Sequence, residues 1–91
     1  MEARAHVLVS GMVIGVFFRA TTRDLAASLG VKGWVCNTGA GKLEAVFEGE
    51  REQVARLVEF CAKGPPGAHV DGIDVRWEEH KGEFSGFEIK Y

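Results

Sequence analysis

The chain has 91 residues, of which 46% are hydrophobic, 11 are Lys or Arg and 13 are Asp or Glu, so its formal net charge is −2. This length leaves no room for a second hydrophobic core, and we expect residues 1–91 to form a single domain. The hydrophobic fraction is ordinary for a folded protein and argues against wholesale disorder. The acidic balance disfavours a general polyanion binder, so we expect neither nucleic acid nor a membrane surface as a partner.

Cysteine and histidine spacing predicts neither a disulfide framework nor a metal site. The two cysteines, Cys36 and Cys61, lie far apart, and the three histidines, His6, His69 and His80, are scattered without ligand spacing. No signal-peptide pattern occurs, and no apolar run approaches the roughly 18 residues of a membrane span. We therefore expect a cytoplasmic protein with free thiols, without a metal and without an organic cofactor.

The first half of the chain predicts a strand, a helix and a second strand. Residues 6–13 are apolar and rich in β-branched side chains, which is typical of a strand. Residues 19–29 favour a helix, and Gly30 suits the position just after its end. Residues 31–37 return to the composition of a strand.

The second half predicts two more strands, a helix and a short terminal strand. After a glycine-rich turn, residues 42–48 alternate apolar and mostly charged side chains, as in an antiparallel strand with one solvated face. Residues 50–63 carry apolar residues at i, i+3, i+4 and i+7, the spacing of an amphipathic helix. Residues 70–79 and 87–91 again alternate, which predicts a fourth strand and a short fifth one.

This order predicts an α+β fold, the ferredoxin-like split βαβ sandwich, with the pattern βαββαβ plus a short terminal strand. The second and third strands form a hairpin, and the charged strand faces imply that two helices cover one face of an antiparallel sheet. A 14-residue helix of about 21 Å also matches a strand of about 20 Å. Because this fold serves many functions, the function has to be argued from particular residues.

The segment at residues 11–19 links the first strand to the start of the first helix. Free backbone N–H groups and the positive end of the helix dipole gather at such a junction, which favours an anion. Gly15 lets the backbone turn inward, and the planar guanidinium of Arg19 can hold two phosphate oxygens at once. An arginine at a helix start is unfavourable with the dipole unless an anion is present. A plain tight turn with a solvated arginine remains the alternative on these residues alone.

The segment at residues 33–41 ends a strand at Asn37, whose amide can hold a water and a substrate oxygen together. Asparagine and glycine are also ordinary turn residues, which is the alternative interpretation. The neighbouring Cys36 should point to the opposite side of the strand, as a packing thiol rather than a nucleophile. The Gly-Lys pair at residues 41–42 is not a nucleotide-binding loop, because the first glycine and the following Ser/Thr are missing and a strand follows.

Taken together, the two segments resemble the acylphosphatase family. The pattern G-x-V-x-G-V-x-F-R at residues 11–19 is followed by G-W-V-x-N-x-x-x-G at residues 33–41, by Gly49 and by Phe-x-Ile-x-Tyr at residues 87–91. The resemblance covers residues 6–91. It implies a monomeric enzyme that hydrolyses the carboxyl–phosphate bond of small acyl phosphates, with inorganic phosphate as product and inhibitor.

The resemblance also implies roles for particular residues. Arg19 would bind the phosphoryl group, Asn37 would position the attacking water, and Thr38 would support the loop. Main-chain N–H groups would cradle the phosphate along the loop formed by Ile14, Gly15, Val16, Phe17 and Phe18. With no Ser/His/Asp set and no carboxylate pair, the expected route is direct in-line attack by water, with a phosphate oxygen as the base implied by the family.

One departure from the family pattern keeps a second function open. Acylphosphatases usually carry Gln where this chain has Ile14, and the loss of one polar contact costs on the order of 1 kcal/mol. The alternative is a noncatalytic module of the same fold that binds a small anion or has a regulatory role. An RNA-recognition module is disfavoured because Glu44 and Glu48 occupy a strand where such modules present stacking aromatics.

Overall fold

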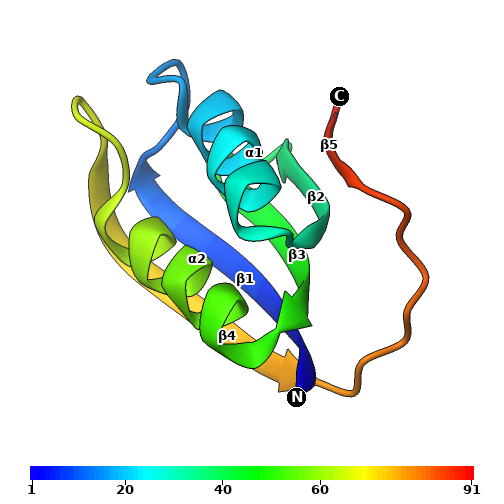
Figure 1. Ribbon diagram of the computed structural model, residues 1–91. Helices are drawn as coiled ribbons and strands as arrows, with labels where there is room; N and C mark the ends of the chain where they lie inside the picture. Colours follow the sequence, from blue (N-terminus) through cyan, green and yellow to red (C-terminus); the bar gives the residue numbers. More distant parts are fainter.

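The computed structural model describes all residues 1–91 and confirms the predicted α+β ferredoxin-like fold. Its strands are β1 (Glu2–Met12), β2 (Lys32–Asn37), β3 (Leu43–Glu50), β4 (His69–Glu78) and β5 (Phe87–Lys90), and its helices are α1 (Phe18–Leu29) and α2 (Arg51–Lys63). Both helices lie on one face of the five-stranded sheet (Figure 1). Neither helix combines the length and the apolarity that crossing a membrane requires.

The sheet has the strand order β4-β1-β3-β2-β5, and it departs from the expected antiparallel arrangement at one edge. The contacts of β1 with β3 and β4 and of β2 with β3 are antiparallel, whereas β5 pairs in parallel with β2. The reason is the route of residues 79–86, here called the crossover segment. It leaves β4 at the end of the sheet where β2 begins and passes to the opposite edge (Figure 1). β5 therefore starts beside the start of β2 and runs in the same direction.

Strand alternation and the helix stripe together build the core between sheet and helices. Val7 and Val9 of β1 face the helices and are fully buried. Of the predicted stripe of α2, Val54, Leu57 and Cys61 are fully buried in the same core, and Val58 is half-buried against it. Burial raises the pKa of the Cys61 thiol to about 12. Because only the thiolate is a good nucleophile, Cys61 is a core residue without reactivity.

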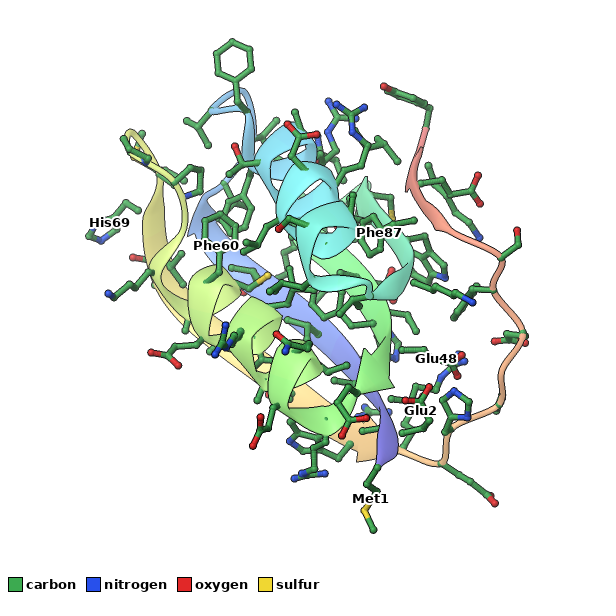
Figure 2. All side chains as sticks on the ribbon, in the orientation of Figure 1. Met1, Glu2, Glu48, Phe60, His69 and Phe87 are labelled. Carbon is green, nitrogen blue, oxygen red and sulfur yellow. The ribbon has the colours of Figure 1, made fainter.

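A buried ion pair on the open face of the sheet fastens the crossover segment. Nη1 of Arg4 donates to Oε2 of Glu48 at 3.0 Å and to Oε1 of Glu83 at 2.7 Å. The Glu48 carboxylate also accepts the backbone N–H groups of Lys81 at 2.8 Å and of Gly82 at 3.2 Å. Figure 2 shows Glu48 between the end of β3 and the crossover segment. The route to β5 therefore depends on one carboxylate that is only 3% exposed.

Replacing Glu48 by glutamine is expected to lower the free energy of unfolding by roughly 2–4 kcal/mol, because it leaves the Arg4 charge short of its buried partner. Burial alone would raise the Glu48 pKa, but the Lys81 amide and the Arg4 guanidinium outweigh it and hold the pKa below its ordinary value. The stabilisation from this carboxylate is then present above about pH 4.3 and lost as the pH falls through the lowered pKa.

Urea unfolding of wild type and Glu48→Gln at a series of pH values measures this effect. The difference between the two proteins should be constant near neutrality and shrink below about pH 4.3. Glu88→Gln, on the exposed surface of β5, is the matched control and should change stability by less than about 0.5 kcal/mol. A difference that does not depend on pH would contradict the assignment to the Glu48 charge.

Candidate active site

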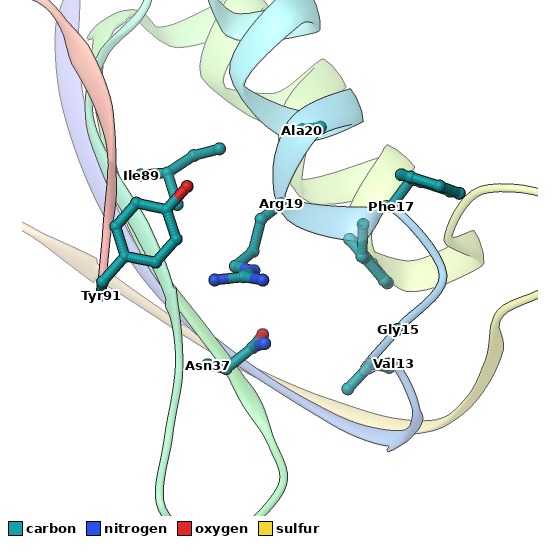
Figure 3. A pocket seen from close by; sticks show the side chains of 9 residues that line it. Val13, Gly15, Phe17, Arg19, Ala20, Asn37, Ile89 and Tyr91 are labelled. Atoms are coloured by element: carbon teal, nitrogen blue, oxygen red, sulfur yellow. The ribbon is translucent and has the colours of Figure 1, made fainter.

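Strand direction brings the predicted site residues to one end of the sheet. β1, β2 and β5 all run the same way, so their last residues meet at the end where α1 begins. Asn37 is the last residue of β2, and Arg19 lies in the first turn of α1. They share a cavity of about 240 Å³ with other residues from β5, α1 and the loop before it (Figure 3). The lining consists of Val13, Gly15, Phe17, Phe18, Arg19, Ala20, Asn37, Ile89 and Tyr91.

The loop between β1 and α1 presents a row of free backbone N–H groups. The amides of residues 14–20 donate to no carbonyl and no side-chain acceptor of the chain. Two residues adopt left-handed backbone conformations there, Gly15 at φ 75° and Phe17 at φ 61°. For Phe17 this conformation costs on the order of 1–3 kcal/mol, and such strain is characteristic of functional loops. Consecutive amides turned by left-handed residues into the start of a helix form a concave site for an anion.

The guanidinium of Arg19 makes no ion pair and no hydrogen bond within the protein. It lies over the face of the Tyr91 ring, whose centroid is 5.3 Å from Cζ. A contact with the ring face leaves the five N–H donors at the edge of the guanidinium free. No side chain that lines the cavity is a carboxylate, and the first turn of α1 carries no acidic residue. The pocket is therefore locally positive, although the chain as a whole has a charge of −2.

The amide oxygen of Asn37 is buried and unpaired, although the residue as a whole is only half-buried. That oxygen is inaccessible to solvent and has no hydrogen-bond partner in the protein. Since Asn37 pairs in the ladder with the core residue Leu43, its side chain lies on the helix side of the sheet and points toward Arg19 (Figure 3). Amide oxygen and nitrogen are interchangeable in such assignments, but either orientation leaves a buried polar group to be satisfied. Asn37 also lines the cavity, so the atom of its amide group that faces the cavity can bind a water or a substrate oxygen there.

Cys36 lies on the other face of β2 from Asn37, as predicted from strand alternation. It pairs in the ladder with Glu44 on the open face of the sheet. Burial, followed by the charge of Glu44, raises the pKa of the Cys36 thiol. The thiol is therefore held protonated outside the pocket and is unsuited to be a nucleophile.

Three of the predicted site residues do not line the cavity with their side chains. Ile14 is 45% exposed, and Val16 packs against the core. The hydroxyl of Thr38 accepts the amides of Ala40 and Lys42, each at 3.2 Å. The support expected of Thr38 thus goes to the turn that follows Asn37 rather than to the loop before α1. The change from Gln to Ile14 falls at a side chain outside the pocket, so it leaves the backbone donors unchanged.

Four lining residues were not predicted as part of the site. Val13 and Ala20 flank the predicted loop, whereas Ile89 and Tyr91 come from the far end of the chain. The Phe-x-Ile-x-Tyr pattern that contains them was visible in the sequence, but only the parallel pairing of β5 with β2 places it beside Arg19. The sequence of a four-residue strand near the end of the chain does not indicate which edge of the sheet the strand will join. The alternation of Ile89 and Tyr91 was the only available hint, since it puts both on one face.

Fold and site together define a small ferredoxin-like protein with a pocket in which an arginine and an asparagine meet a row of backbone donors, an arrangement that suits an anion. A family model described as acylphosphatase matches residues 5–89. An acylphosphatase of Pelotomaculum thermopropionicum is 55% identical over 90 residues, which is 99% of this chain and 98% of that protein. The chain belongs to the acylphosphatase family, whose enzymes are hydrolases of acyl phosphates.

Solved structures agree with this assignment. An acylphosphatase from Coxiella burnetii superimposes with a TM-score of 0.91 at 38% identity, covering 98% of this chain and 93% of that one. The acylphosphatase from Bacillus subtilis gives a TM-score of 0.92 at 30% identity, with complete coverage of both chains. The family resemblance predicted from the two segments is thereby confirmed.

Proposed function

We propose that this protein hydrolyses acyl phosphates in the pocket at the end of β2, with Arg19 and the loop amides as the phosphoryl site and Asn37 as the residue that positions water. One observation carries the proposal: an arginine without an ion pair and an asparagine whose buried amide oxygen has no partner line the same cavity. Arg19 can be satisfied by a ligand that accepts hydrogen bonds from a cation, and Asn37 by a small polar molecule beside that ligand.

The arrangement suits direct attack of water on phosphorus. The water oxygen forms a bond to phosphorus while the bond from phosphorus to the acyl oxygen breaks, and the carboxylate leaves with the electron pair. A carboxylate is a good leaving group, so no acid has to protonate it. The water gives its proton to an oxygen of the phosphoryl group, because no His, Asp or Glu lines the cavity. Arg19 and the loop amides stabilise the equatorial oxygens, and Asn37 supplies the orientation.

The same pocket supports three further parts of the proposal. Inorganic phosphate has the charge and shape that the cradle holds, so it should be both product and competitive inhibitor. Arg19, Asn37 and the loop amides complete the proposed reaction without a residue from a second copy, so we propose that residues 1–91 act as a single monomeric domain. Both cysteines are free thiols, which suits the reducing conditions of the cytoplasm.

Hydrolysis of benzoyl phosphate, followed by the fall of its ultraviolet absorbance, tests the proposal directly. We expect steady-state turnover without added metal, competitive inhibition by inorganic phosphate, and no kinetic step near pH 6–7 that could be assigned to a histidine. His6 and His69 lie outside the cavity, so His6→Gln and His69→Gln are suitable controls and should leave the pH profile unchanged. Binding of phosphate without turnover would instead support the noncatalytic module.

A further inference from the structure

The phosphate cradle and Arg19 account for only part of the cavity. Across Arg19 from the loop stands a second wall, formed by Ile89 and Tyr91 at the end of β5 (Figure 3). Neither side chain carries a charge, and the cavity has no cation other than Arg19. When the phosphoryl oxygens take the loop amides and the guanidinium fork, this wall is what remains for the rest of the substrate.

The Tyr91 ring is available to a ligand. The residue is fully exposed, and its ring faces the Arg19 guanidinium, with Cζ 5.3 Å from the ring centroid. Ile89 beside it is half-buried and packs on the core, so it gives the wall a fixed base. An exposed aromatic ring next to an aliphatic side chain gains most by covering an apolar group, whereas the two side chains offer a charged group no partner.

We propose that Ile89 and Tyr91 form the acyl-group subsite, and that the enzyme selects acyl phosphates with an uncharged, apolar acyl group, alkyl or aromatic, over those with a charged one. The inference rests on the proposed function, because it gives a binding place to the acyl group of the substrate whose phosphoryl group the cradle holds. It makes Tyr91 a specificity-determining residue. Its effect should follow the acyl group and leave the phosphoryl site unchanged.

Two substrates that share the phosphoryl group test this assignment, acetyl phosphate and benzoyl phosphate. In Tyr91→Ala, kcat/KM for benzoyl phosphate should fall about tenfold, mainly through KM, while acetyl phosphate should change by no more than about twofold. The inhibition constant of inorganic phosphate should stay within about twofold, since the cradle is intact. Tyr91→Phe keeps the ring and should retain the preference for benzoyl phosphate.

Trp77→Ala is the matched control. Trp77 is also an exposed aromatic ring stacked on an arginine, Arg51, whose Cζ lies 4.1 Å from the ring centroid, but it stands on β4 outside the cavity. Trp77→Ala should leave kcat/KM unchanged for both substrates. Equal losses for both substrates in Tyr91→Ala would overturn the subsite, because they would show that Tyr91 acts through Arg19 or through folding.

A comparison that needs no variant tests the same inference in the wild-type protein. Butyryl phosphate and succinyl phosphate have the same chain length, but the second ends in a carboxylate. We expect kcat/KM to favour butyryl phosphate by at least about tenfold. Equal rates would overturn the apolar subsite while leaving the proposed hydrolysis standing, whereas failure to hydrolyse any of these substrates would overturn both.

Discussion

Replacing Arg19 by lysine is expected to lower kcat/KM for benzoyl phosphate at least about a hundredfold, and replacing it by alanine about a thousandfold or more. The guanidinium offers a planar fork that can bind two phosphoryl oxygens, whereas the lysine ammonium is a single flexible point charge. Because the fork binds both substrate and product, inhibition by inorganic phosphate should weaken in both variants. Steady-state kinetics with phosphate as competitor measures both effects.

Arg23→Lys is the matched control for this experiment. Arg23 lies one turn further along α1, is exposed, and pairs with Asp24 at 3.3 Å rather than facing the cavity. It should leave kcat/KM and phosphate inhibition unchanged. An Arg19→Lys protein with near wild-type rates and unaltered affinity for phosphate would remove Arg19 from the phosphoryl site.

The expected loss is large because Arg19 acts in an unusual setting. In most proteins an arginine in a half-buried position is satisfied by a carboxylate, and losing it costs a modest amount of stability. Here the guanidinium contacts the face of the Tyr91 ring, and its N–H donors form no hydrogen bond with the protein. Its contribution therefore appears when phosphate binds, and the folded protein without ligand should lose little stability when Arg19 is replaced.

Local patterns in the sequence were sufficient for most of the fold and for the centre of the site. The stripe of Val54, Leu57, Val58 and Cys61 predicts α2, because the same 3.6-residue period identifies the helix and the face that it buries. Strand alternation likewise predicts that Asn37 and Cys36 lie on opposite faces of β2. Arg19 was predictable because a cation at a helix start opposes the dipole and so indicates an anion.

The remaining features depend on contacts between distant segments. The parallel pairing of β5 follows from the crossover segment, which is fastened by Arg4 and Glu48, two residues 44 positions apart in sequence. In the sequence each of them looks like an ordinary solvated charge on a strand. Tyr91 joins the site only because that crossover carries β5 to the edge beside β2. The left-handed conformation of Phe17 was also not predictable, since local propensity disfavours it for a residue of this kind.

Replacing Asn37 by alanine is expected to lower kcat by about a hundredfold to a thousandfold, while KM and the inhibition constant of inorganic phosphate change by less than about threefold. The carboxamide orients the water that attacks phosphorus, and that contribution is made in the transition state rather than in the bound substrate. The opposite pattern, a large rise in KM with kcat unchanged, would make Asn37 a binding residue and contradict its role with water.

Stability provides a second measurement on the same variant. The buried Asn37 oxygen has no partner in the protein, so its removal discards an unsatisfied polar group, and the free energy of unfolding should be unchanged or higher. Gln53→Ala is the matched control, because the Gln53 oxygen on α2 is also buried and unpaired but lies outside the cavity. It should leave kcat unchanged. We expect Asn37→Ala to lose turnover while it keeps or gains stability, and Gln53→Ala to keep its turnover. This result would show that the Asn37 amide serves the reaction rather than packing.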